Sequence, residues 1–118
     1  MIQATFRETE TTREVKISGH ANHAEAGKDI VCAAVSGIAF ALLGYVENSG
    51  LNYVSGENEG YIEIRVFRPD DKIHAVFDMA MIGLMQVEMA HSSCITVSID
   101  GIAKKIEKNS GIGDDSEK

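Results

Sequence analysis

Hydrophobic and polar residues alternate along several short stretches of the chain, which is the pattern of half-buried β-strands. In the first stretch, Ile2, Ala4 and Phe6 alternate with polar neighbours. Five stretches of this kind predict five strands: residues 2–7, 14–18, 51–54, 61–67 and 95–100. Polar segments at residues 8–13 and 55–60 are predicted to connect the strands of two hairpins.

Two longer apolar segments have the length and composition of helices. Residues 30–48 are preceded by Asp29, a good N-cap residue, and residues 71–90 are preceded by Pro69 and Asp70. The predicted order is therefore strand-strand-helix-strand-strand-helix-strand. This order predicts a two-layer α+β domain with both helices on one face of a mixed five-stranded sheet.

The chain length of 118 residues fits a single domain of ordinary size. We expect that domain to occupy residues 1–108. Residues 109–118 are polar, contain two glycines and show no apolar pattern, so they are predicted to form a disordered tail.

Both predicted helices carry apolar residues nearly all round, whereas a helix lying on a sheet needs only one apolar stripe. The first helix also has small residues at helical spacing, which would let another helix approach closely: Ala33, Gly37, Ala41 and Gly44. A second copy of the chain would cover these surfaces, so we expect a homodimer. The alternative is that the small residues pack the two helices of one subunit together.

The chain is acidic, with 18 Asp and Glu against 11 Lys and Arg and a formal net charge of −7. This balance argues against direct nucleic-acid binding and suits a basic protein or peptide as partner. The two cysteines do not form a CxxC pair, which favours free thiols in a reducing cytoplasm. The N-terminus lacks the apolar core of a signal peptide. The longest apolar run, residues 30–46, is shorter than the ~20 residues that span a bilayer, so we expect no membrane association.

Candidate chemistry is concentrated between His20 and Cys32, at the two ends of a predicted loop rich in Gly and Ala, residues 20–28. If Asp29 is the N-cap, Cys32 lies in the first turn of the helix. Unpaired backbone N–H groups and the helix dipole would there favour the thiolate, which is the nucleophilic form. The same N–H groups could stabilise an oxyanion.

A neutral histidine could take the thiol proton and return it to a leaving amine. His20 is better placed than His23, because it lies at the end of a strand rather than inside a loop. Against this hypothesis, a cysteine near a helix start is more often a small buried residue, and the charge of Asp29 would oppose ionisation of the thiol.

A zinc site is a competing hypothesis for the same residues. His20, His23 and Cys32 could supply three ligands, with His91 or Cys94 as the fourth, although the spacing is not a common zinc pattern. We expect neither a metal nor another cofactor. The remaining histidine, His74, has no evident partner and is predicted to be solvated.

The residues of this stretch resemble the signature of the ribosomal-processing cysteine protease family, Prp: Gly19, His20, Ala21, Gly27, Asp29, Ile30, Val31, Cys32, Ala33 and Ser36. The resemblance extends over about residues 1–100. It implies a dimeric cysteine endopeptidase that removes the N-terminal extension of a large-subunit ribosomal protein.

By position, the resemblance makes Cys32 the nucleophile and His20 the general base and acid. It implies that the substrate contacts a small set of neighbouring residues: Gly19, Ala21, Gly27, Asp29 and Ser36. The alternative is a non-catalytic dimeric module that binds a ribosomal or ribosome-assembly protein and in which Cys32 is structural.

Overall fold

The computed structural model describes residues 1–19 and 26–101, with the backbone alone for residues 26–29. Seven elements follow one another: β1 (Ile2–Glu8), β2 (Thr12–Ser18), α1 (Ala26–Glu47), β3 (Tyr53–Asn58), β4 (Tyr61–Phe67), α2 (Asp71–Ala90) and β5 (Ile95–Asp100). The predicted order of strands and helices is confirmed. The predicted boundary at residue 108 and the tail at 109–118 lie outside the described residues.

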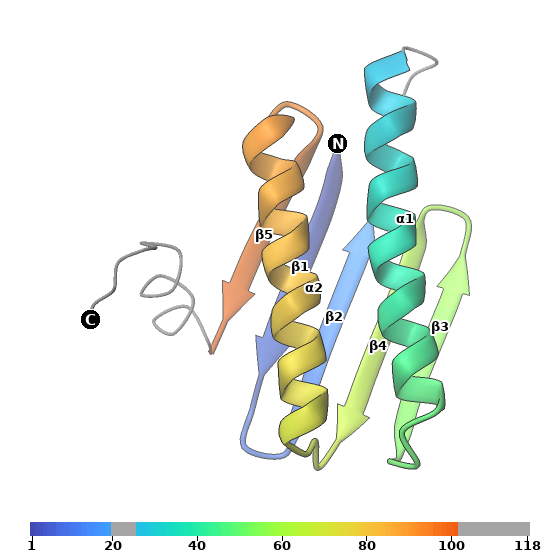
Figure 1. The fold of residues 1–118 in the computed structure, drawn as a ribbon, viewed down its shortest axis with the longest axis vertical. Coiled ribbons are helices and arrows are strands. Elements are labelled where there is room, and N and C mark those ends of the chain that lie inside the picture. Colours follow the sequence, from blue (N-terminus) through green and yellow to red (C-terminus); the bar gives the residue numbers. More distant parts are fainter. Residues whose placement is uncertain (20–25, 102–118) are drawn as a thin grey trace.

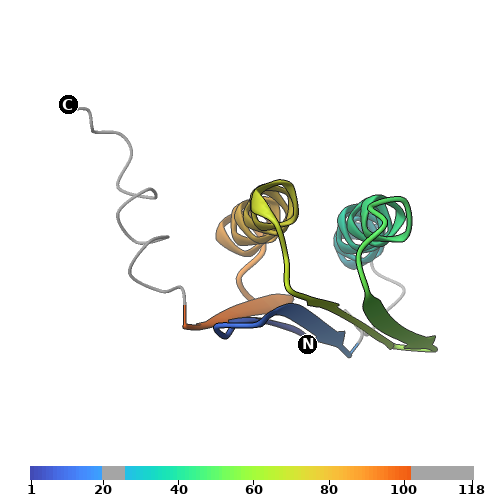
Figure 2. The same ribbon diagram turned by 90° about the horizontal axis from the view of Figure 1, so that it is seen from below.

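The five strands form one mixed sheet in the order β3-β4-β2-β1-β5. β1 and β5 are parallel, and the other neighbouring strands are antiparallel. Both helices lie on one face of the sheet and run antiparallel to each other, and none of the described residues forms a helix on the opposite face (Figures 1 and 2). The predicted two-layer α+β architecture is therefore confirmed.

The alternating pattern of the strands positions the core. Ile2, Ala4 and Phe6 of β1 are buried, while the residues between them are exposed. Ile73 and Phe77 of α2 are fully buried against this face of the sheet. The side chains at every second position of β1 and those at helical spacing in α2 therefore form one apolar layer.

β3 differs from its prediction, because it begins at Tyr53 and continues to Asn58. The segment predicted as a connection is mostly strand, and only Glu59 and Gly60 form the turn to β4. Gly60 has a φ of +76°, which a tight turn requires. Ser, Gly, Glu and Asn have low strand propensity, so pairing with β4 decides the conformation of residues 55–58.

The prediction that residues 8–13 connect the first two strands is wrong at both ends, because β1 includes Glu8 and β2 begins at Thr12. Arg13 belongs to β2, and its side chain is fully buried on the helix side of the sheet. Its guanidinium forms an ion pair with Asp78 at 2.8 Å and lies 5.4 Å from the centre of the Phe77 ring. His74, predicted to be solvated, is half-buried, and its Nδ1 lies 3.2 Å from Arg13 Nη1. A buried arginine needs such partners, which a sequence pattern does not reveal.

By length and composition alone, each helix is apolar enough to cross a membrane: Ile30–Glu47 within α1 and Asp71–Ala90 of α2. The argument from the length of the apolar run therefore does not decide the matter. In the fold, each helix lies along the sheet with one side packed in the core. Apolar side chains remain exposed on the other sides, including Met79 at 71% and Met89 at 79%.

Candidate active site

One end of the sheet brings together three segments: the end of β2, the first turns of α1 and the turn between β3 and β4 (Figure 1). The backbone N–H of Gly19 donates to the carbonyl oxygen of Gly60 at 2.9 Å and so joins β2 to that turn. A pocket of about 300 Å³ opens between α1 and these strand ends. It is lined by Ile2, Ile17, Gly19, Cys32, Val35, Ser36, Ala39, Phe40, Glu57, Asn58, Gly60, Tyr61 and Ile62.

Gly19 is required where the chain leaves β2. Its φ is +98°, and a Cβ at this position would collide with the carbonyl oxygen of Met1. Any other residue would strain the backbone and displace the neighbouring strand. Gly19 therefore allows the backbone conformation that ends β2 next to Met1.

Cys32 is a free, half-buried cysteine of α1 that packs against the core on one side and lines the pocket on the other. The other cysteine, Cys94, is also free but buried. Of the two thiols, only that of Cys32 lines the described pocket, as a nucleophile must.

The prediction that Asp29 caps this helix is wrong, because α1 already begins at Ala26. Cys32 lies six residues after Ala26 and therefore in the second helical turn, not the first. The argument from unpaired N–H groups does not apply at that depth, since the effect of the helix end fades within one turn. Aspartate is favourable both as an N-cap and inside a first turn, so residue type alone could not place the start.

α1 presents one stripe of residues to the pocket at a spacing of four: Cys32, Ser36 and Phe40. Ser36 is exposed, and Phe40 is 48% exposed although it is a large apolar residue. Sequence reasoning named Ser36 but missed Phe40. The helical spacing from Cys32 was the signal that could have found it.

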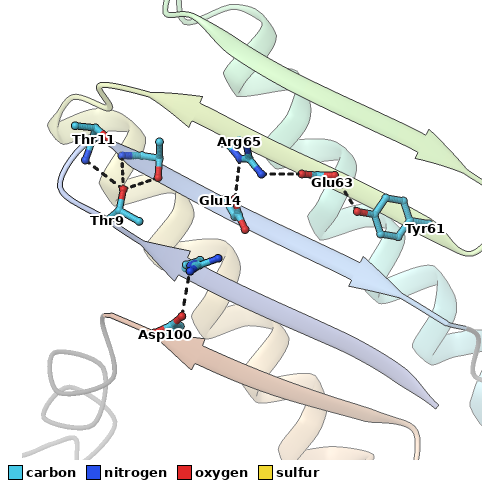
Figure 3. Close-up of polar contacts among 9 residues, drawn as sticks. Thr9, Thr11, Glu14, Tyr61, Glu63, Arg65 and Asp100 are labelled. Carbon is cyan, nitrogen blue, oxygen red and sulfur yellow. Dashed lines mark hydrogen bonds and ion pairs between the residues drawn. The ribbon is translucent and has the colours of Figure 1, made fainter.

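Polar groups line the pocket on the side of the hairpin. Glu57 and Asn58 come from the end of β3, and Tyr61 begins β4. The Tyr61 hydroxyl donates to Glu63 at 2.9 Å (Figure 3). This hydrogen bond, followed by desolvation and the negative charge of Glu63, raises the pKa of Tyr61 above its usual 10.0. Tyr61 is therefore a neutral hydrogen-bonding group at physiological pH.

From Tyr61, polar contacts continue across the sheet face that carries no helix (Figure 3). The second oxygen of Glu63 accepts from Arg65 at 3.3 Å, and Arg65 Nε donates to Glu14 at 2.8 Å. Glu14 is buried and Arg65 is partly exposed. Sequence reasoning did not find this network, because it joins residues of β2 and β4 that are neighbours only in the sheet.

The structure places three of the predicted site residues together at the pocket: Gly19, Cys32 and Ser36. Gly27 and Asp29 lie in the first turn of α1, where the structure describes the backbone alone. His20 and Ala21 lie outside the described residues.

The zinc hypothesis finds no support at residues 1–19 and 26–101, where no three His, Cys, Asp or Glu residues form a metal-binding group. Two of its ligands, His20 and His23, lie outside these ranges. Its other candidates are Cys32, Cys94 and His91, and both cysteines are free of disulfide bonds.

The sequence of the chain also matches a known protein family. Residues 1–96 match the model of the family described as cysteine protease Prp. The chain belongs to this family. The family resemblance inferred from the residues around Cys32 is confirmed, and the protein is a cysteine protease.

Curated relatives carry the name ribosomal processing cysteine protease Prp. The protein of Mycoplasma genitalium is 29% identical over 80 residues, which cover 68% of this chain and 81% of that protein. The protein of Staphylococcus aureus is 28% identical over 103 residues, which cover 82% of this chain and 95% of that protein.

Solved structures share the fold. SMU.848 from Streptococcus mutans has a TM-score of 0.68 at 27% identity, over 85% of this chain and 94% of that chain. The processing protease Prp of S. aureus, in complex with a covalently linked product peptide, has a TM-score of 0.74 at 22% identity. That match covers 84% of this chain and 99% of the S. aureus chain.

Proposed function

We propose that this cysteine protease is an endopeptidase that removes the N-terminal extension of a large-subunit ribosomal protein during ribosome maturation. The observation that carries the proposal is the position of Cys32, a free thiol in a pocket at the end of β2. The name shared by its relatives supplies the substrate class.

Cys32 is the nucleophile and His20 the general base and acid in this proposal. Gly19 lines the same pocket as Cys32, and the chain continues from Gly19 directly into His20. His20 takes the thiol proton, and the Cys32 sulfur attacks the carbonyl carbon of the scissile peptide bond. His20 then gives that proton to the leaving amine, which leaves a thioester on Cys32. Water, deprotonated by His20, hydrolyses the thioester and restores the thiol.

The pocket supports binding of an apolar side chain next to the scissile bond. Most of its lining is apolar, and its volume of about 300 Å³ suits one large side chain. Ser36 and Gly19 lie at its wall, and we propose that Ala21, Gly27 and Asp29 contact the substrate backbone. No cofactor takes part in this chemistry.

The acidic chain suits a basic substrate. Ribosomal proteins are basic, and the net charge of −7 would increase their rate of encounter with this protein. We propose a cytoplasmic enzyme that acts on the ribosomal protein itself and makes no direct contact with nucleic acid or membrane.

We also propose a homodimer formed by the outer faces of the helices. Phe40, Met79 and Ile82 are exposed there, and an apolar groove of about 300 Å³ runs between α1 and α2. An ideal Cβ on Gly37 meets nothing within 4 Å, so this part of the small-residue stripe does not pack the helices of one subunit together. Sedimentation should show a dimer that Met79→Asp converts to a monomer, while Val54→Asp on β3 should not.

A cleavage assay tests the proposed catalytic residues. The substrate is a peptide that copies the junction between the extension and the mature ribosomal protein. We expect Cys32→Ala and His20→Ala each to lower turnover at least about a thousandfold, because removal of either group stops the same step. Cys94→Ala, which removes the buried thiol, is the matched control and should still cut.

Two results would contradict the assignment. Full cleavage by Cys32→Ala would show that Cys32 is not the nucleophile. Binding of the peptide by the unmodified protein without any cleavage would favour the non-catalytic module instead.

A further inference from the structure

The two edge strands of the sheet, β5 and β3, differ in the partners of their outward backbone groups. At β5, the outward N–H of Val97 donates to the carboxylate of Glu88, a side chain from α2, at 3.1 Å. At the other edge, β3 pairs only with β4, and all six of its residues are exposed. Within the described part of the chain, one outward N–H of β5 is therefore paired by a side chain, whereas no strand covers the outer edge of β3.

The hydrogen-bond register identifies which backbone groups of β3 face outward. Phe67 N–H donates to the carbonyl oxygen of Asn52 at 2.9 Å, so the even-numbered positions of this pairing face β4. Because antiparallel pairs alternate, Tyr53, Ser55 and Glu57 direct their N–H and C=O groups away from the sheet. These three residues present a row of donors and acceptors about 14 Å long.

β3 also lacks the features that normally block an exposed edge. Its sequence, Tyr-Val-Ser-Gly-Glu-Asn, contains neither Pro nor Lys. Its register with β4 is continuous from Tyr53 to Asn58, without a bulge. An exposed edge without such protection is a template for pairing with another strand.

The open edge is continuous with the active-site pocket. Glu57 and Asn58, the last residues of β3, line the same pocket as Cys32. Glu59 follows in the turn, so this end of the edge is acidic and complements a basic peptide. A peptide that leaves the pocket over this turn would reach the outward groups of Glu57 first and then those of Ser55.

We propose that the edge of β3 binds an extended segment of the peptide substrate, on one side of the scissile bond, as a sixth strand of the sheet. This inference rests on the proposed function. Backbone hydrogen bonds to Tyr53, Ser55 and Glu57 hold the segment, as in other cases of strand addition. Such bonds select an extended, unfolded peptide of sufficient length more than a particular sequence.

Ser55→Pro tests this binding mode with little disturbance of the fold. Proline removes the outward N–H of Ser55 and places its ring at the edge, while the inward bonds of residues 54 and 56 to β4 remain. Ser55→Ala is the matched control, because it removes the hydroxyl and keeps the backbone donor. Circular dichroism and the melting temperature verify that both variants are folded.

The kinetic test compares three peptides: a short one that fills only the pocket, and two that extend it by about six residues at one end or the other. In the unmodified protein, kcat/KM should be about tenfold higher for one of the extended peptides than for the short one. Ser55→Pro should abolish that advantage and cut the short peptide normally, whereas Ser55→Ala should retain it. Equal kcat/KM of the extended peptides for Ser55→Pro and the unmodified protein would overturn the proposal.

Hydrogen exchange measures peptide binding at β3 independently of cleavage, so it tests this proposal apart from the proposed catalytic residues. In Cys32→Ala, the bound extended peptide should slow exchange at the amides of Ser55 and Glu57. Slowed exchange without cleavage by the unmodified protein would support the edge and contradict the proposed catalysis. Unchanged exchange, or a dimer that Ser55→Pro dissociates, would contradict the edge proposal alone.

Discussion

The two ends of the domain differ in how their polar groups are used. At the end that carries Cys32, the pocket is mainly apolar and open, and a single backbone bond joins Gly19 to Gly60. At the opposite end, Arg13 is fully buried against Asp78, and Asp70 caps α2 by accepting from the N–H of Ile73 at 2.9 Å. The contrast suggests that this opposite end stabilises the fold, while the Cys32 end keeps space for a substrate.

The turn between β1 and β2 lies at this stabilised end (Figures 1 and 3). The Thr9 hydroxyl accepts from the N–H groups of Thr11 and Thr12 at 3.2 and 3.0 Å, so the turn satisfies its own backbone donors. Such local bonds fix where β2 begins and thus which way Arg13 points. The ordered turn and the buried ion pair therefore support each other.

The largest effect on stability is expected from Arg13→Ala. The change removes the buried partner of Asp78 and the packing over Phe77, which should lower the free energy of unfolding by about 3 kcal/mol. Urea denaturation measures it. Arg7→Ala, which breaks the exposed ion pair with Asp100, is the matched control and should change stability by less than about 0.5 kcal/mol.

Cys32→Ala is the corresponding substitution at the other end of the domain. Cys32→Ala should leave stability nearly unchanged, because the side chain is only half-buried. Similar losses for Arg13→Ala and Arg7→Ala, or a larger loss for Cys32→Ala, would contradict the division of roles between the two ends.

A smaller effect is expected from Gly19→Ala, which introduces a Cβ where φ is +98° and the Met1 carbonyl oxygen is in the way. We expect a loss of about 2 kcal/mol in unfolding free energy and a larger proportional loss of cleavage, since the direction of the chain into His20 changes.

Gly56→Ala is the control for this change, because a Cβ there meets nothing within 4 Å and the backbone is extended. It should change stability by less than about 0.5 kcal/mol. Equal effects of the two substitutions on unfolding would show that Gly19 is not needed for its conformation.

The smallest effect concerns Tyr61, whose raised pKa comes first from its hydrogen bond to Glu63. Because the folded protein favours the neutral phenol, this contribution to stability is present below about pH 10 and is lost as the pH rises through the higher folded-state pKa. Following the Tyr61 ring signals by NMR should give a pKa closer to the ordinary value in Glu63→Gln. The same pKa in Glu63→Gln and the unmodified protein would show that this hydrogen bond is not its cause.

Much of the fold could be predicted from the sequence in segments where apolar residues recur at the spacing of a strand or of a helix. Ile2, Ala4 and Phe6 mark β1 because every second side chain of the strand enters the core. Asp70 marks the start of α2 because its carboxylate satisfies a free N–H group. Asp29 failed as the same kind of signal, because α1 begins at Ala26 and an aspartate is favourable inside a first turn as well as at an N-cap.

The sequence by itself determined the order of the elements, the family and the importance of the stretch that holds Cys32, because these depend on residue type at fixed spacing. Only the tertiary structure decided that Arg13 is buried, that Glu57 and Tyr61 line the pocket beside Cys32, and that the β3 edge of the sheet is open. Each of these depends on side chains from different elements meeting in space. Pairing energies between distant segments fix those meetings, and no local pattern records them.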